Sequence, residues 1–202
     1  MNRRPQTKTA KNGPSIGLFG GSFNPAHAGH IHLAEIAKRN LRLDQIWWLV
    51  SPQNPLKPKQ PSYESRVASV HNLGLPRGMK VAHLERDFGT QYTIDLIHRA
   101  QTHYPSHRFV FLMGADNFAQ LPKWRAWQDI INAIPIGIIA RPTNTGEPHF
   151  RARLGQAARM FGYARVPERA SHIMAGRATP CWTYITAPLN GQSSSAIRRA
   201  KA

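Results

Sequence analysis

Cysteine is nearly absent from this chain, and so are long apolar runs. Its 202 residues include one cysteine, Cys181, which excludes an internal disulfide and a thiolate metal cluster. No stretch reaches the roughly 18–20 apolar residues that a membrane span needs. Residues 1–12 are polar and basic without an apolar segment, unlike a secretory signal. We therefore expect a cytoplasmic protein without a membrane partner, with a disordered basic leader at residues 1–13 and a single domain at residues 14–202.

Acidic residues are also scarce. The chain has 10 acidic and 27 basic residues, which gives a formal net charge of +17. A positive field of this size attracts polyanions, and both nucleic acids and the phosphates of a nucleotide are polyanions. A solvated basic surface without a specific partner is an equally open interpretation. The charge therefore informs on association and leaves the fold undetermined.

Short apolar runs alternate with segments of helical period along the chain. The apolar runs predict strands at residues 16–19, 46–50, 80–84, 109–113, 134–140 and 182–186. The helical periods predict helices at residues 31–40, 62–73, 92–103, 124–131 and 195–199. Strands that alternate with helices form right-handed units around a parallel sheet. We therefore expect an α/β fold with a doubly wound, mostly parallel sheet, whose ligand binds beyond the carboxyl ends of the strands.

The turn after the first predicted strand combines glycines with two histidines. It reads GGSFNPAHAGH over residues 20–30 and contains neither a GxGxxG fingerprint nor a P-loop lysine. Gly20 and Gly21 permit close approach of the backbone to a ligand. Free N–H groups at the start of the following helix favour an anion. A lone histidine there is ordinarily a surface or capping residue, but His27 and His30 form a pair that can donate to one phosphate group.

A serine-rich segment precedes the last predicted helix. Ser193, Ser194 and Ser195 are followed by Arg198. By itself the segment is typical of a common helix N-cap with a surface arginine. It also has the elements of an anion site, because hydroxyls and helix N–H groups would lie beside a guanidinium that can grip two oxygens.

The two segments together resemble the HxGH nucleotidyltransferases. The turn at residues 20–30 is similar to their G-G-S/T-F-D/N-P-x-H-x-G-H signature, and residues 193–198 are similar to their S-S/T-S/T-x-I-R element. Four more segments resemble the bacterial nicotinate-mononucleotide adenylyltransferases, namely PQNPLKPK at 52–59, YTID at 92–95, MGADN at 113–117 and KW at 123–124. Asn24, where many members have aspartate, and Leu96, where threonine is common, depart from the pattern.

This resemblance implies a Rossmann-like nucleotidyltransferase that transfers AMP from ATP to nicotinate mononucleotide, with Mg²⁺ carried by ATP and no metal site made by the protein alone. It assigns catalytic roles to His27, His30, Lys57 and Arg198. The ATP-binding residues that it implies are Gly20, Gly21, Ser22, Phe23, His27, His30, Gly114, Asp116, Ser193, Ser194, Ser195 and Arg198. The residues that it implies for the nicotinate nucleotide are Asn54, Lys57, Tyr92, Thr93, Trp124 and Arg125.

Three of these residues also have interpretations that need no ligand. Asp116 follows a buried strand, where its carboxylate can accept from ribose hydroxyls or cap the next helix. Trp124 offers a flat face to a pyridine ring or packs in the core beside Trp127. Lys57 faces a phosphate or is an exposed lysine in a proline-stiffened loop.

Two other functions stay open at this point. An enzyme of the same class can take another acceptor, such as nicotinamide mononucleotide. A basic nucleic-acid-binding module without activity is the weaker alternative, because no RNA-binding or helix-turn-helix signature is present. Assembly into a homo-oligomer is also left open by the sequence.

Overall fold

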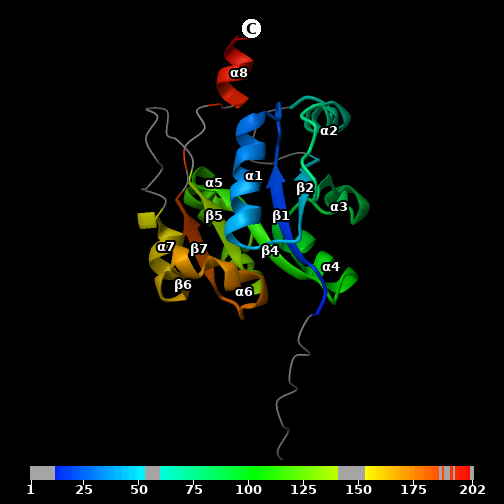
Figure 1. Ribbon diagram of the computed structural model, residues 1–202. Helices are drawn as coiled ribbons and strands as arrows, with labels where there is room; N and C mark the ends of the chain where they lie inside the picture. The colour runs from blue at the N-terminus through cyan, green and yellow to red at the C-terminus, as the bar shows by residue number, and fades with distance from the viewer. Residues whose placement is uncertain are drawn as a thin grey trace, which may run out of the picture.

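A parallel β-sheet runs through the middle of the protein (Figure 1). The computed structural model describes residues 12–52, 60–140, 153–186, 188, 192 and 194–200, with only the backbone of 195, 196 and 200. Seven strands lie in the order β3-β2-β1-β4-β5-β7-β6, and each described pairing is parallel. They are β1 (Ser15–Gly21), β2 (Gln45–Val50), β3 (Met79–Val81), β4 (Arg108–Gly114), β5 (Ile136–Ile139), β6 (Arg165–Val166) and β7 (Trp182–Ile185).

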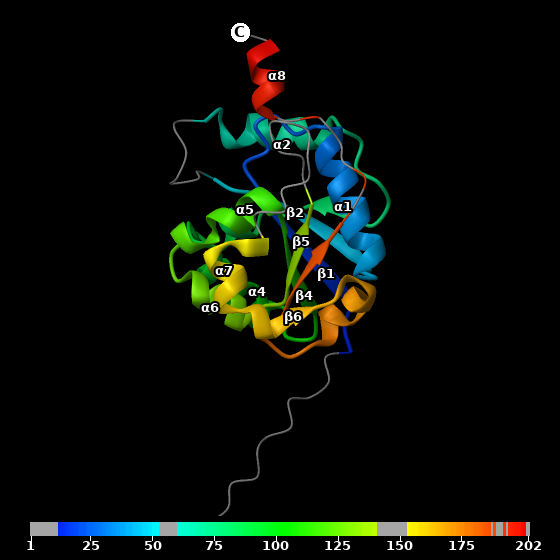
Figure 2. The same ribbon diagram turned by 90° about the vertical axis from the view of Figure 1, so that its left-hand side faces the viewer.

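Helices cover both faces of this sheet (Figure 2). One face carries α1 (Ala28–Asn40), α2 (Tyr63–His71) and the 3₁₀ helix η4 (Glu168–Gly176). The other carries α3 (Leu84–Asp87), α4 (Thr93–His103), α5 (Ala115–Gln120), η1 (Leu121–Lys123), α6 (Trp127–Ala133), α7 (Gln156–Met160) and η3 (Gly162–Ala164). The last helix, α8 (Ser194–Ala200), stands beyond the carboxyl ends of the strands.

The central strands are buried on both faces, which explains their nearly continuous apolar sequences. Side chains of a strand alternate between the two faces of its sheet. In β4, Phe111 and Met113 belong to the core under α4 and α6, whereas Val110 and Leu112 belong to the core under α1. A strand without a solvent face needs apolar residues at both its odd and its even positions. The continuous apolar run at residues 109–113 is therefore typical of a central strand.

The predicted fold class is confirmed, and the pattern of alternation located most elements. The expected strands at residues 16–19, 46–50, 109–113, 134–140 and 182–186 correspond to β1, β2, β4, β5 and β7. The helices expected at 31–40, 62–73, 92–103 and 195–199 correspond to α1, α2, α4 and α8. Division into a leader and one domain stays a prediction, since residues 1–11 lie outside the described part of the chain.

Two predicted boundaries were wrong. The strand expected at residues 80–84 ends at Val81, and Leu84 instead opens the short helix α3. The helix expected at 124–131 begins only at Trp127, because Trp124 is extended and Ala126 has a left-handed backbone with φ +50°. Apolar periodicity missed both features because Leu84 and Trp124 pack against the same core from non-periodic segments. The elements β6, α5, α7 and η4 were not predicted, since each is short or of 3₁₀ type.

The strand order reverses between β1 and β4, and this places the site. Chain connections leave β1 toward β2 on one side, while β4 and β5 continue on the other side. At such a switch point the loops after neighbouring strands diverge, and a crevice opens at the carboxyl edge of the sheet. The turn after β1 holds the glycines and histidines, Gly114 ends β4, and Asp116 follows it.

None of the helices in the described part of the chain has the length and apolar character that a membrane crossing requires.

Candidate active site

The turn between β1 and α1 brings the two histidines together. His27 is extended, with φ −154° and ψ 167°, and it is the N-cap of α1. The His27 and His30 rings lie with their centroids 3.9 Å apart. The backbone N–H of His27 donates to Nδ1 of His30 at 3.3 Å. A neutral imidazole that accepts at Nδ1 carries its proton on Nε2, so this bond leaves Nε2 of His30 as a donor.

An aromatic pocket fixes the orientation of His30. The Phe23 ring lies edge-on at 5.1 Å between centroids, and the rings of Phe19 and Trp48 lie at 6.4 and 6.5 Å. Phe23 adopts φ +46°, a backbone region that bulky residues avoid. A Cβ at Gly21 would meet the Phe23 ring at 2.9 Å, so the second glycine is needed for this packing. The turn is therefore a preorganised structure in which ring packing holds a histidine in one orientation.

Helix α2 holds this turn by hydrogen bonds to its backbone. Its Ser69 hydroxyl accepts from the backbone N–H of Ala26 at 3.1 Å and lies 3.3 Å from the carbonyl oxygen of Phe23. Arg66, one turn earlier, donates to the carbonyl of Ser22 at 3.0 Å. The sequence analysis missed both residues. The spacing places Arg66 on one helical face with Val70, four residues later, but an arginine there reads as an ordinary helical residue, so nothing in the sequence indicated that its side chain is buried.

The C-terminal element docks on the same turn. The Ser194 hydroxyl donates to the carbonyl of Pro25 at 2.9 Å, and Nη1 of Arg198 donates to the carbonyl of Asn24 at 2.5 Å. His32 of α1 also contacts the carbonyl of Pro188 at 2.7 Å. The structure thus unites two motifs that are about 170 residues apart in the sequence. Ser193 and the side chain of Ser195 lie outside the described residues.

The carboxyl end of β4 supplies the next predicted residues. Gly114 is the N-cap of α5, and Asp116 lies in the first turn of that helix, half-buried. The interpretation of Asp116 as the N-cap is therefore wrong, since Gly114 holds that position. A carboxylate in the first turn still interacts favourably with the helix dipole, and its place beside the switch point is compatible with a ribose contact.

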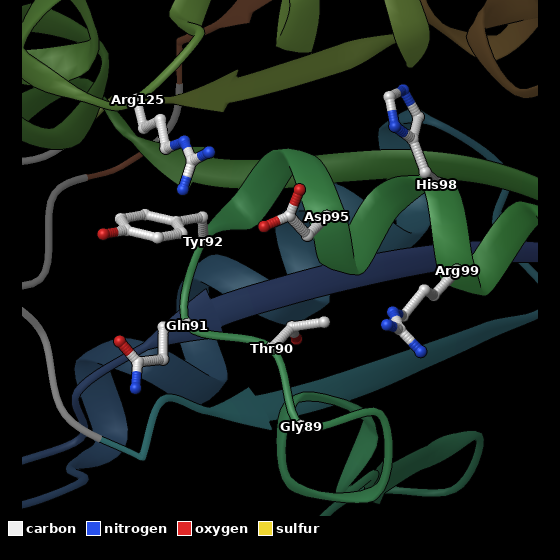
Figure 3. Close-up of a pocket in the computed structure, with 8 residues that line it drawn as sticks. All are labelled: Gly89, Thr90, Gln91, Tyr92, Asp95, His98, Arg99 and Arg125. Atoms are coloured by element: carbon white, nitrogen blue, oxygen red, sulfur yellow. The ribbon is translucent and has the colours of Figure 1, made fainter.

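A hollow of about 380 Å³ opens at the start of α4 (Figure 3). Its walls include Tyr92 and Arg125, and the Arg125 guanidinium carbon lies 4.5 Å from the centre of the Tyr92 ring. The remaining lining residues are Gly89, Thr90, Gln91, Asp95, His98 and Arg99. The Arg125 side chain therefore points toward Tyr92, which is the N-cap residue of α4. A cation held over an aromatic face is stabilised in one place.

Other residues predicted for the acceptor are placed differently. Thr93 opens α4 next to Tyr92, but it does not line the described hollow. Trp124 is half-buried, with its ring edge-on to Phe111 at 6.4 Å between centroids, and it packs against the core. Trp124 therefore packs against the core, and its stacking on a pyridine ring stays a prediction. Asn54 and Lys57 lie outside the described residues.

Two further properties concern the pKa of a glutamate on α3 and the side chains that could hold a metal ion. Burial raises the pKa of Glu85 on α3 to about 7, against an opposing effect of the Arg66 charge. Within the described ranges no group of three or more His, Cys, Asp or Glu side chains is arranged to hold a metal ion.

Comparison with known proteins adds the family. Residues 18–200 match the family model described as cytidylyltransferase-like. A protein of Roseobacter denitrificans named probable nicotinate-nucleotide adenylyltransferase is 44% identical over 190 residues, 94% of each chain. A protein of the same name from Caulobacter sp. strain K31 is 45% identical over 188 residues, which cover 91% of this chain and 96% of the relative.

A solved structure has the same fold. The nicotinic acid mononucleotide adenylyltransferase of Plasmodium falciparum, complexed with NaAD, superposes with a TM-score of 0.66 at 17% identity, over 93% of this chain and 83% of its own. At such low identity the likeness concerns the fold alone. The family match and the two bacterial relatives each cover more than nine-tenths of the chain. This protein therefore belongs to the cytidylyltransferase-like family and, within it, to the nicotinate-nucleotide adenylyltransferases.

Proposed function

We propose that this chain transfers AMP from ATP to nicotinate mononucleotide, giving nicotinate adenine dinucleotide and pyrophosphate. The observation that carries the proposal is the convergence of His27, His30, Ser194 and Arg198 on one turn at the switch point. In the reaction, an oxygen of the acceptor's phosphate attacks the α-phosphorus of ATP. The bond from the α-phosphorus to the bridging oxygen breaks, and its electron pair leaves with pyrophosphate. No covalent enzyme intermediate is needed.

The residues of the turn would stabilise charge on the transferring phosphate. We assign His27 and the Nε2 donor of His30 to the phosphate oxygens of ATP. Arg198 of α8 contacts the same turn, because its Nη1 donates to the carbonyl of Asn24. The planar guanidinium can donate to two phosphate oxygens at once. We assign Lys57 to the same charge. Gly20, Gly21, Ser22, Phe23, Gly114, Asp116 and the serines at 193–195 would bind the rest of ATP. Preorganised donors of this kind are worth the most at the transition state.

Magnesium is proposed to enter with ATP. Mg²⁺ usually keeps several waters and binds through substrate phosphates instead of an all-protein cage. We assign no protein ligand to the cation, because the described residues that we assign to the phosphates, His27, His30, Ser194 and Arg198, have side chains that can donate hydrogen bonds to phosphate oxygens. Activity should follow the concentration of the Mg²⁺–ATP complex. Full turnover in excess chelator would contradict this part of the proposal.

For the acceptor, we propose a site formed by Tyr92, Thr93, Trp124 and Arg125, with Asn54 and Lys57 toward its phosphate. Trp124 would stack on the pyridine ring, and backbone N–H donors near Thr93 and Arg125 would bind the carboxylate. A neutral amide would point an NH₂ group at such donors and leave a buried donor unpaired, at a cost of roughly 1–3 kcal/mol. We therefore expect the acid to be preferred over the amide by at least about tenfold in kcat/KM.

The test compares both mononucleotides in wild type and three variants. Trp124→Ala should weaken both acceptors in parallel, because stacking serves either ring. Arg125→Met should lower the preference for the acid by about fivefold, since a charge about 4 Å away in water contributes about 1 kcal/mol. Arg165→Met is the matched control, because Arg165 also stacks on an aromatic ring, Trp182, but at the β6 edge of the sheet. Equal use of both nucleotides by the wild type would contradict acid specificity and favour the nicotinamide alternative.

Oligomeric assembly and a cytoplasmic location stay predictions. The non-enzymatic nucleic-acid alternative is set aside, because the chain belongs to an enzyme family over residues 18–200.

A further inference from the structure

Arg66 is an arginine whose side chain is almost fully buried. Only 2% of its surface is exposed, which places it among the largest fully buried side chains of the described chain. Its guanidinium donates four hydrogen bonds to backbone carbonyls. Nη1 donates to the carbonyls of Ser22 at 3.0 Å and Ser51 at 2.6 Å, Nη2 to Pro52 at 2.6 Å, and Nε to Pro61 at 3.1 Å.

These four acceptors come from three separate segments of the chain. Ser22 follows β1, Ser51 and Pro52 follow β2, and Pro61 precedes α2. β1 and β2 are neighbours in the sheet, so the guanidinium bridges the carboxyl ends of two adjacent strands. All four acceptors are main-chain carbonyls, so the contacts fix the backbone itself. A buried charge is costly unless hydrogen bonds satisfy it, and here the main chain provides these bonds.

The bond to Ser22 has a consequence for the glycine-histidine turn. In a planar trans peptide the C=O and N–H groups point in opposite directions. Because the Ser22 carbonyl points at Arg66, the N–H of Phe23 points away from it. Ser69, on the same helix, holds Ala26 and Phe23 at the other end of the turn. The segment between Ser22 and Ala26, which leads directly to His27, is thus held at both ends by α2.

We propose that Arg66 is a positioning residue for adenylyl transfer, which acts by fixing the turn before His27 relative to the chain after β2. The inference rests on the proposed function. Arg66 touches no substrate; it determines where the backbone donors and His27 lie. Reactions that depend on placement are sensitive to it, since a misplacement of about 1 Å can lower the rate about 100-fold.

Lysine cannot replace arginine in this role. The guanidinium is a rigid, planar fork whose three nitrogens address carbonyls in different directions. A lysine offers a single ammonium, which cannot reach the carbonyls of Ser22, Pro52 and Pro61 together. The charge would be retained and the geometry lost. Arg66→Lys therefore separates positioning from charge.

The kinetic test uses Arg66→Met and Arg66→Lys in the full chain, with Arg108→Met as the matched control. Arg108 also donates from Nε to a carbonyl, that of Gly13 at 3.1 Å, but at the amino end of the sheet. With ATP, Mg²⁺ and nicotinate mononucleotide, we expect kcat to fall at least tenfold in both Arg66 variants, with each KM within threefold. Arg108→Met should stay within twofold of wild type. Circular dichroism and thermal melting supply the folded fraction to which each kcat is normalised.

A double-mutant cycle shows whether Arg66 acts through the turn. If Arg66 positions His27, the loss caused by Arg66→Lys shrinks to threefold or less in a His27→Ala background. A role in general stability instead gives losses that multiply. Multiplying losses overturn the proposal, and so does a folded Arg66 variant with turnover within threefold of wild type. If Arg66→Met does not fold, Arg66→Lys decides alone.

Hydrogen exchange supplies a readout that is independent of activity. Backbone amides of residues 22–24, 26 and 27 should exchange at least tenfold faster in Arg66→Lys than in wild type and Arg108→Met. Unchanged exchange there overturns the positioning role even if turnover falls. A wild type that forms no dinucleotide would contradict the proposed function, whereas the exchange experiment would still test the restraint by Arg66.

Discussion

His27 and His30 occupy one helix start but have different surroundings. His30 is enclosed by Phe19, Phe23 and Trp48, and its Nδ1 is occupied by the backbone of His27. His27 is the N-cap residue of the helix and is 3% exposed. Aromatic packing therefore holds one ring, and backbone geometry places the other. Both rings are thus held by contacts within the protein itself, and such preorganisation is the condition for electrostatic stabilisation without reorganisation.

Replacing either histidine should affect catalysis far more than folding. We expect His27→Ala and His30→Ala each to lower turnover about 100- to 1,000-fold, the effect of losing one donor to a charged transition state. Of the two, His30→Ala should also be the less stable, by about 1–3 kcal/mol, because it leaves a gap among three aromatic rings. Steady-state kinetics and thermal denaturation measure these effects. Near-normal turnover in both variants would refute the catalytic assignment.

Glu85 gives a pH dependence of stability that can be isolated. Its pKa is raised by burial from 4.5 to about 7. Between these values the native state keeps the proton and the unfolded chain releases it, so stability decreases as pH rises, by at most about 3 kcal/mol. Below pH 4.5 and above pH 7 the contribution is constant.

The measurement is urea denaturation of wild type and Glu85→Gln between pH 4.5 and 8. The variant should gain stability relative to wild type as pH rises through this range, because glutamine does not ionise. Glu64→Gln, an exposed position on α2, is the control for the chemical change. A difference between wild type and Glu85→Gln that is the same at every pH would show that Glu85 does not titrate near 7.

At the scale of elements, α2 connects the sheet to the glycine-histidine turn between β1 and α1. Its N-cap Ser62 accepts from the backbone N–H of Ser65 at 3.1 Å, and its buried face carries Arg66 and Val70. The helix is short, so its position depends on packing more than on intrinsic propensity. Through Arg66 and Ser69 it holds the turn after β1 and the chain after β2 by hydrogen bonds to their backbone.

Removing this cap should lower stability and leave chemistry intact. We expect Ser62→Ala to reduce the free energy of unfolding by about 1 kcal/mol, the usual cost of losing an N-cap. Ser65→Ala should change little, because Ser65 contributes its backbone N–H to the cap. Turnover well below the melting temperature should be unchanged in both. If Ser62→Ala instead lowered turnover tenfold without a change in stability, the cap would have a direct role at the site.

The molecule as a whole is strongly basic. With 27 basic and 10 acidic residues, it has a field that concentrates polyanions around it. Exposed arginines such as Arg169 and Arg177 contribute to this field. The substrates of the proposed reaction are themselves anions, so the same field increases their encounter rate.

Binding to nucleic acid should therefore be weak, non-specific and sensitive to salt. We expect retention on a DNA column at about 50 mM salt and loss of binding by about 200 mM, because counterion release makes such affinity fall steeply with salt. Fluorescence anisotropy with two unrelated duplexes checks the lack of sequence preference. Tight, sequence-specific binding at physiological ionic strength would indicate a second function.

The sequence by itself determined the fold class and the position of the glycine-histidine turn on which the candidate site is built. Alternation of apolar runs with helical segments specified a parallel α/β sheet, because a buried strand and an amphipathic helix each need a distinctive local pattern. The spacing of Gly20, Gly21, His27 and His30 located the turn, since all its residues lie within one connection. Elements and turns of this kind can be predicted from residues that are close together in the sequence.

Only the tertiary structure decided which distant residues meet. Arg66 reads in sequence as an ordinary helical arginine, yet it is buried on carbonyls from three segments. Likewise, the docking of Ser194 and Arg198 on Pro25 and Asn24 depends on where the strand order reverses. Single-chain periodicity carries no information on contacts across the fold, because these are selected by the packing free energy of all elements together. Local pattern thus specifies the elements, and packing assembles them into a site.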